Sequence, residues 1–146
     1  MTEMTELTVN GVWASPKDNG VDLDGHRLMT RPDGIDQWTE EKRRLWLNDN
    51  GYDLSVDLND KGVWLHAVTT NLTTVPNARW DASDLSWVKA TLQSGAQSSP
   101  LIFWELPQGL LPITFAFRTM NGAAGLFRIT TYSVKDKKAT IQIKLA

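Results

Sequence analysis

Apolar and polar residues alternate most regularly in residues 53–68, DLSVDLNDKGVWLHAV. Because successive strand residues point to opposite faces of a sheet, this alternation predicts a β-hairpin. A loop at 59–62 places the small and medium apolar residues on one face, in the pairs Leu58 with Val63, Val56 with Leu65 and Leu54 with Ala67. The other face then pairs Asp57 with Trp64 and Ser55 with His66.

A second hairpin is predicted in residues 115–130, FAFRTMNGAAGLFRIT. A turn at Asn121-Gly122 would mix polar and apolar groups on both faces, whereas a loop at 121–123 separates them. That register buries Phe115, Phe117, Phe127 and Ile129, with Phe115 opposite Ile129 and Phe117 opposite Phe127, and places Arg118, Arg128, Thr130 and Tyr132 on the other face. Since no helix follows the glycines, we interpret them as a hairpin tip and not as a phosphate-binding loop.

Two segments have helical periodicity. The first, residues 36–51, offers Asp36 or Thr39 as its N-cap and Gly51 as its left-handed end. Its inward-facing residues are predicted to be Trp38, Leu45 and Trp46. The second, residues 80–95, has Asp81 as its predicted N-cap and a single apolar stripe formed by Leu85, Val88 and Leu92.

Further strands are predicted at 7–14, at 20–30 around an Asp24-Gly25 turn, at 101–107, and at 139–146, which ends a C-terminal β-meander. Together the elements predict an α+β fold, a largely antiparallel sheet of about six to eight strands with two helices packed on one face. Because no linker or repeat interrupts the chain, we expect residues 1–146 to form a single domain.

The composition excludes several function classes. The net charge of -2 and the pI of about 5.6 provide no basic surface for sequence-independent binding of nucleic acid. The absence of cysteine excludes disulfides and thiolate metal sites. No stretch approaches the ~20 apolar residues of a membrane span, and the first residues lack a signal-peptide pattern. We expect no nucleic-acid or membrane partner and a cytoplasmic location, with a secreted form left open because a signal peptide already removed would leave no trace.

Four stretches carry a resemblance to a known module: GVDLDGHRLMTRP, WLNDNGYDL, RWDASDL and FAFRTMNGAAGLFRIT. They resemble segments of a small uncharacterised bacterial accessory module that is attached to sigma-factor-like regulators and to membrane metallopeptidase-type sensors. The resemblance covers about residues 9–145. In the last hairpin, Asn121 stands where that module usually has an acidic residue and Arg128 where Gln is common. The resemblance implies an accessory or sensing domain and carries over no active-site residue.

Two groups of polar residues are candidates for metal binding or catalysis. Asp18, Asp22 and Asp24 precede a glycine as in a calcium loop, but Gly20 and Arg31 stand where an EF-hand needs its first and last carboxylates. We therefore expect no metal and no cofactor. His66, Ser55, Asp53 and Asp57 share one face of the predicted hairpin and superficially suggest a catalytic triad, while His26 lies on a different hairpin. The solvated polar face of an antiparallel sheet is the interpretation we favour.

Seven tryptophans and two arginines supply the candidate binding residues. Trp38, Trp64 and Trp104 could stack on a sugar or aromatic ligand, whereas Trp13, Trp46, Trp80 and Trp87 are expected to fill the seam between helix and sheet. Arg118 and Arg128, with Tyr132 on the same face, could bind an acidic partner. The sequence favours a noncatalytic binding or sensing module for an unidentified small ligand or protein, including a second copy as a homodimer. A small hydrolase-like enzyme and a Trp-lined carbohydrate-binding module are the alternatives.

Overall fold

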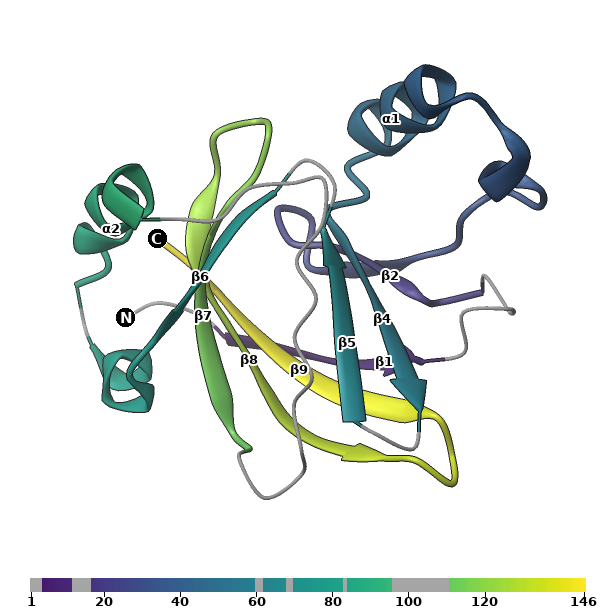
Figure 1. Cartoon of the computed structure of the whole chain (residues 1–146). Helices are drawn as coiled ribbons and strands as arrows, with labels where there is room; N and C mark the ends of the chain where they lie inside the picture. Colours follow the sequence, from purple (N-terminus) through teal and green to yellow (C-terminus); the bar gives the residue numbers. More distant parts are fainter. Residues whose placement is uncertain (1–3, 12–16, 60–61, 68–69, 83, 96–110) are drawn as a thin grey trace.

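The computed structural model describes residues 4–11, 17–59, 62–67, 70–82, 84–95 and 111–146 (Figure 1). Over these residues the chain forms nine strands and two α-helices, with antiparallel pairing throughout. The predicted α+β class and the C-terminal meander are confirmed. The strands are divided between two sheets, where the sequence was interpreted as one. The strand predicted at 101–107 lies outside the described residues.

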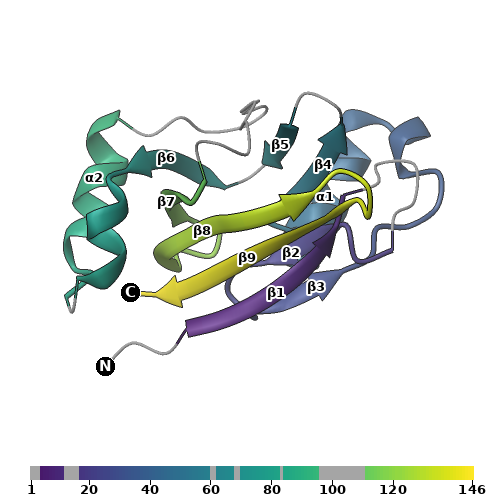
Figure 2. The ribbon, with the colours of Figure 1, turned by 90° about the horizontal axis from the view of Figure 1, so that it is seen from below.

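The two sheets share one apolar core. The five-stranded sheet has the order β1 (Met4–Asn10), β9 (Lys138–Leu145), β8 (Ala124–Ser133), β7 (Ile113–Arg118) and β6 (Asn71–Val75). The four-stranded sheet has the order β3 (Arg27–Met29), β2 (Gly20–Asp22), β4 (Leu54–Asn59) and β5 (Gly62–Ala67). Their apolar faces meet in one cluster that includes Val56, Leu65, Phe117 and Ile141. In Figure 2, β4 and β5 lie behind the layer formed by β8, β9 and β1.

The hairpin of β4 and β5 has the predicted register in all five predicted pairs, from Leu54 with Ala67 to Leu58 with Val63. Pairing continues to Asn59 with Gly62. The predicted inward residues are all buried in the core shared by the two sheets. Because a slip by one residue would expose that whole set, the hydrophobic pattern alone is sufficient to determine this pairing.

The hairpin of β7 and β8 has the predicted faces but a different register. Phe115 pairs with Phe127, not with Ile129, and Phe117 pairs with Gly125. The loop has three residues as predicted, but it is formed by 120–122, with a Thr119 to Gly122 turn and Gly122 at a φ of 90°. The resulting shift of two residues keeps the side chains of the paired residues 113–118 and 124–129 on their predicted faces.

Among the candidate site residues whose side chains are described, Tyr132 lies on the face opposite to the predicted one. β8 pairs Ile129 with Ile141 and then Thr131 with Thr140, so Thr130 is an extra residue in a β-bulge. The bulge reverses the alternation beyond it, and Tyr132 is buried in the core opposite Ala139. Tyr132 is therefore a core residue and not part of an exposed binding face.

Helix α1 (Glu40–Asp49) follows a short 3-10 helix, η1 (Ile35–Gln37). Thr39 caps α1 as predicted, because its hydroxyl accepts a hydrogen bond from Lys42 N (3.2 Å). Gly51 has the predicted left-handed conformation beyond the helix, with a φ of 71°. The prediction for Leu45 was wrong: its side chain is 55% exposed, and Leu47 is the buried residue of α1.

Helix α2 (Trp87–Gly95) follows the 3-10 helix η2 (Asn77–Asp81) and packs on the outer face of the five-stranded sheet. The predicted stripe is confirmed, since Leu85, Val88 and Leu92 are buried in one cluster with Ala116, Ala124 and Leu126. Asp81 is not the N-cap, because it ends η2; Asp84 Oδ1 accepts from Ser86 N (2.9 Å) before the helix begins.

No described helix has the length and apolar character needed to cross a membrane.

Candidate docking groove and carboxylate cluster

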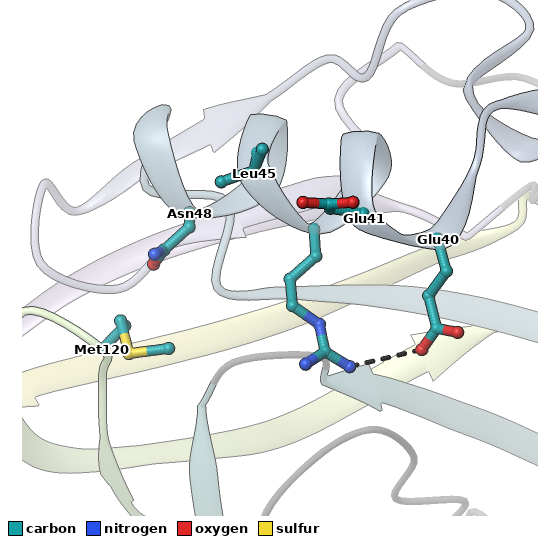
Figure 3. A pocket seen from close by; sticks show the side chains of 6 residues that line it. Glu40, Glu41, Leu45, Asn48 and Met120 are labelled. Carbon is teal, nitrogen blue, oxygen red and sulfur yellow. Dashed lines mark hydrogen bonds and ion pairs between the residues drawn. The ribbon is translucent and has the colours of Figure 1, made fainter.

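An open groove of about 470 Å³ lies between α1 and the tip of the hairpin of β7 and β8 (Figure 3). Its lining residues are Glu40, Glu41, Arg44, Leu45, Asn48 and Met120. Two of them are large apolar side chains that are mostly exposed, Leu45 at 55% and Met120 at 56%. Exposed apolar side chains that converge on one hollow are typical of an interaction site.

Of the three described charged residues that line the groove, two form an ion pair with each other. Arg44 Nη2 lies 3.3 Å from Glu40 Oε1, an i to i+4 ion pair on the surface of α1. Glu41 has no ion-pair partner among the residues that the structure describes. The described lining residues include two carboxylates and one guanidinium, which together carry a formal charge of one negative unit.

Three carboxylates gather beneath the hairpin tip. One oxygen each of Asp22, Asp24 and Asp53 lies within 4.8 Å of the other two. Asp22 ends β2, Asp24 belongs to the following turn, and Asp53 directly precedes β4. The pairing of β2 with β4 brings these separate parts of the chain together. In the sequence, Asp22 and Asp24 belong to a loop that fails the requirements of a calcium site and Asp53 to a predicted polar sheet face, and no local pattern connects the three.

Two of the carboxylates have well-defined donors. Asp22 Oδ1 accepts from Gly25 N (2.9 Å), and Asp22 Oδ2 accepts from Arg27 Nε (2.9 Å). Asp53 Oδ2 accepts from Leu23 N (2.7 Å). Both residues are buried, so these bonds hold the turn between β2 and β3 against the start of β4.

Asp24 connects the cluster to the hairpin tip. Its Oδ2 accepts from the hydroxyl of Thr119 (3.1 Å) and, at a longer distance, from Asn121 Nδ2 (3.5 Å). Its Oδ1 is buried and has no hydrogen-bond partner among the described residues. Met120, which lines the groove, stands between the two residues that bind Asp24.

The pKa of the Asp53 carboxyl is raised to about 7, chiefly by burial; the nearby charges of Asp24 and Asp22 act in the same direction, and the amide hydrogen bonds from Leu23 and Asp24 act against it. The sheet face that the sequence predicts to be polar and solvated is closed to solvent at Asp53 and Ser55, because both residues are buried. The side chain of His66, the other member of the suggested triad, is outside the description. His26 Nδ1 lies 2.7 Å from the hydroxyl of Thr5.

Of the three predicted tryptophan candidates, Trp38 is the one whose side chain the structure describes. Trp38 is half-buried, and Lys42 Nζ lies 4.3 Å from its ring centroid. Trp64 is in β5, but its side chain is outside the description, and Trp104 lies outside the described residues altogether.

The two arginine candidates lie on the same face, and α2 of the same chain packs on the part of that face formed by Ala116, Ala124 and Leu126. Arg128 stacks over Trp80 of η2 at 4.3 Å, and its Nε donates to Gln142 Oε1 (2.7 Å). Arg118 pairs with Ala124 and Arg128 with Thr114, so the two arginines are about 13 Å apart along the strands. The prediction of an open face with adjacent arginines was wrong, because the exposed face of a strand pair cannot be distinguished in sequence from one covered by a helix.

The groove is not predicted from the sequence. Leu45 is predicted to face the core, and Met120 directly precedes the predicted loop at 121–123 without a predicted role. The sequence signal for an exposed apolar residue in this helix is the run LWL at residues 45–47. A helix with a narrow apolar stripe cannot bury three consecutive apolar residues.

Comparison of the chain with protein-family models, with curated proteins and with solved structures finds no match.

Proposed function

We propose that the chain is a noncatalytic binding module and that the groove between α1 and the tip of β7 and β8 is its docking site. The occupant we propose is a short segment of a partner protein that presents an apolar side chain next to a basic one. The observation that carries the proposal is the pair Leu45 and Met120, two mostly exposed apolar side chains from distant parts of the sequence that line the same groove (Figure 3).

The apolar part of the occupant follows from these two side chains. An isolated exposed leucine needs no explanation, but two large apolar residues lining one hollow leave a surface that a partner can remove from water. Methionine is unbranched and adapts to differently shaped partners, which suits a rim residue of a docking site.

The basic part of the occupant follows from the charge of the groove. Since Arg44 is paired with Glu40, the carboxylate of Glu41 is the charge left to meet a partner. A lysine or arginine beside the apolar side chain would complement it, which increases specificity and the rate of association.

The resemblance of the chain to an accessory module of regulators and sensors supports the same class of function. The hydrolase-like and carbohydrate-binding alternatives gain no support from the groove, because its described lining residues include no histidine or tryptophan.

The proposal can be tested with two peptides, Arg-Leu-Arg-Leu-Arg and Glu-Leu-Glu-Leu-Glu, both capped at their ends. The basic peptide should shift backbone amide signals of α1 and of residues 119–122 in a two-dimensional NMR titration at low salt, and the acidic peptide should not. The variants Leu45→Asp and Glu41→Lys should each weaken the binding of the basic peptide about tenfold or more.

Matched controls use side chains of the same type outside the groove. Met4 is 47% exposed on β1, and Asp49 is exposed on α1 outside the groove lining. The variants Met4→Asp and Asp49→Lys should bind the basic peptide like the wild type. Equal binding of both peptides, or equal loss in the control and groove variants, would exclude the groove as a basic-peptide site. Concentration-dependent dimerisation that Leu45→Asp abolishes would show that the occupant is a second copy of the chain.

A further inference from the structure

The carboxylate cluster contains a buried oxygen that lacks a donor. Asp24 Oδ1 is buried without a hydrogen-bond partner among the described residues, and an oxygen of the buried Asp53 side chain lies within 4.8 Å of the Asp24 carboxylate. A buried acceptor without a donor is costly, so native structures almost always supply one. A carboxylic acid is a donor, and Asp53 is the buried side chain that can provide it.

We propose that Asp24 and Asp53 share one proton, and that this proton holds the hairpin tip beside α1, so that docking in the groove weakens when the proton is lost. The statement about docking rests on the proposed function. The statement about the proton rests on the cluster alone.

The charges around the pair favour a single shared proton. Asp22 supplies a second negative charge but is compensated by Arg27, and the hairpin tip contributes only the neutral donors Thr119 and Asn121. Close carboxylates that cannot all ionise retain a proton on one of them. Burial raises the pKa of Asp53 to about 7, so Asp53 carries the proton and loses it near neutral pH.

Loss of the proton would act on Asp24. Asp53 is anchored at the start of β4 by Leu23 N, and Asp22 is anchored by Gly25 N and Arg27. Asp24 is half-exposed on a turn, so it is the carboxylate that can move away from the new charge. Because it binds the residues on both sides of Met120, its movement would displace one wall of the groove.

The proton is tested first in the free protein, in buffer with EDTA. The amide signals of Thr119, Asn121 and Gly122 should titrate in the wild type with a midpoint near pH 7, which is about the pKa of Asp53. In Asp53→Asn they should not titrate, because the asparagine amide can donate to Asp24 without ionising. Since histidine also titrates near neutral pH, His26→Gln is included and should keep the wild-type midpoint.

Three results would overturn the shared proton: no titration of the tip amides in the wild type, the same titration in Asp53→Asn, or its loss in His26→Gln. If Asp53→Asn does not fold, Asp24→Asn serves instead. Removal of the neighbouring charge should lower the midpoint, and an unchanged midpoint would contradict the proposal.

The coupling to docking is tested with the peptide Arg-Leu-Arg-Leu-Arg, whose charge is constant in this range. Its affinity for the wild type should fall about fivefold or more between about pH 6 and about pH 8.5, and its affinity for Asp53→Asn should stay constant. A constant affinity in the wild type would overturn the coupling. Titrating tip amides without peptide binding at any pH would overturn the proposed function and leave the shared proton standing.

Discussion

Asp53 is 4% exposed, and one of its carboxylate oxygens lies within 4.8 Å of carboxylate oxygens of Asp22 and Asp24. Nothing in the local sequence distinguishes it from a solvated aspartate at the start of a strand. Its chemistry is set by what surrounds it, because burial and like charges both disfavour the ionised form.

The stability of the protein should therefore decrease as the pH rises to neutrality. The pKa of Asp53 is about 7 in the folded state and about 3.9 in an unfolded chain, so between these values the folded state holds a proton that the unfolded state has released. This contribution is complete below about pH 4 and is lost as the pH rises through about 7. Urea unfolding should show that the wild type loses about 2–3 kcal/mol between about pH 5 and about pH 8 that Asp53→Asn does not lose.

The variant Asp57→Asn is the control for this prediction, because Asp57 lies in β4, the strand that Asp53 directly precedes, and is only half-buried. It should have the pH dependence of the wild type. If the free energy of unfolding had the same pH dependence in the wild type, Asp53→Asn and Asp57→Asn, Asp53 would titrate as an ordinary aspartate.

At the scale of elements, the sheet face that carries Arg118 and Arg128 is the docking surface of η2 and α2. Trp80 is buried between this sheet and the helical segment. The centroid of its ring lies 4.3 Å from Arg128 Cζ and 4.5 Å from Lys144 Nζ. Lys144 Nζ also donates to the carbonyl of Trp80 (2.6 Å). These contacts give the two arginines different roles, although the sequence predicts the same role for both.

We expect Arg128→Ala to lower the free energy of unfolding by about 1–2 kcal/mol, since it removes the stacking on Trp80 and the hydrogen bond to Gln142. Arg118→Ala, the matched control on the same face, should cost less than about 1 kcal/mol. Denaturant unfolding of both variants measures the difference. Equal costs would mean that the contact between Arg128 and Trp80 contributes no stability.

At the scale of the whole molecule, one apolar cluster joins the two sheets. Residues from β2, β4 and β5 meet residues from β7, β8 and β9 in it, and Phe117 lies fully buried with its ring centroid 6.1 Å from that of Phe127. A side chain in this position stabilises both sheets at once.

Replacement of Phe117 by Ala should lower the free energy of unfolding by about 3–5 kcal/mol, because it leaves a cavity between the sheets. The adjacent variant Arg118→Ala provides the comparison on the opposite face. Spectroscopic probes of both sheets in Phe117→Ala should report one unfolding transition, with its midpoint at a lower denaturant concentration than in the wild type. A cost under about 1 kcal/mol would show that the core does not depend on this ring.

Several features of the fold could be predicted from the sequence because they are local. The alternation in β4 and β5 is sufficient for their register, and the cap at Thr39 and the stripe of Leu85, Val88 and Leu92 follow from neighbouring residues. The faces of β7 and β8 could also be predicted, since an error of two residues in register leaves side-chain direction unchanged.

Only the tertiary structure decided what each face packs against. Alternation shows that one side of a strand is buried and does not show by which element, so neither the division into two sheets nor α2 on the arginine face could be read from it. The bulge at Thr130 has no signal in a run of β-branched residues, and therefore the burial of Tyr132 could not be foreseen. The groove and the carboxylate cluster each combine residues from distant segments, and their spacing depends on strand pairing and helix packing that no local pattern contains.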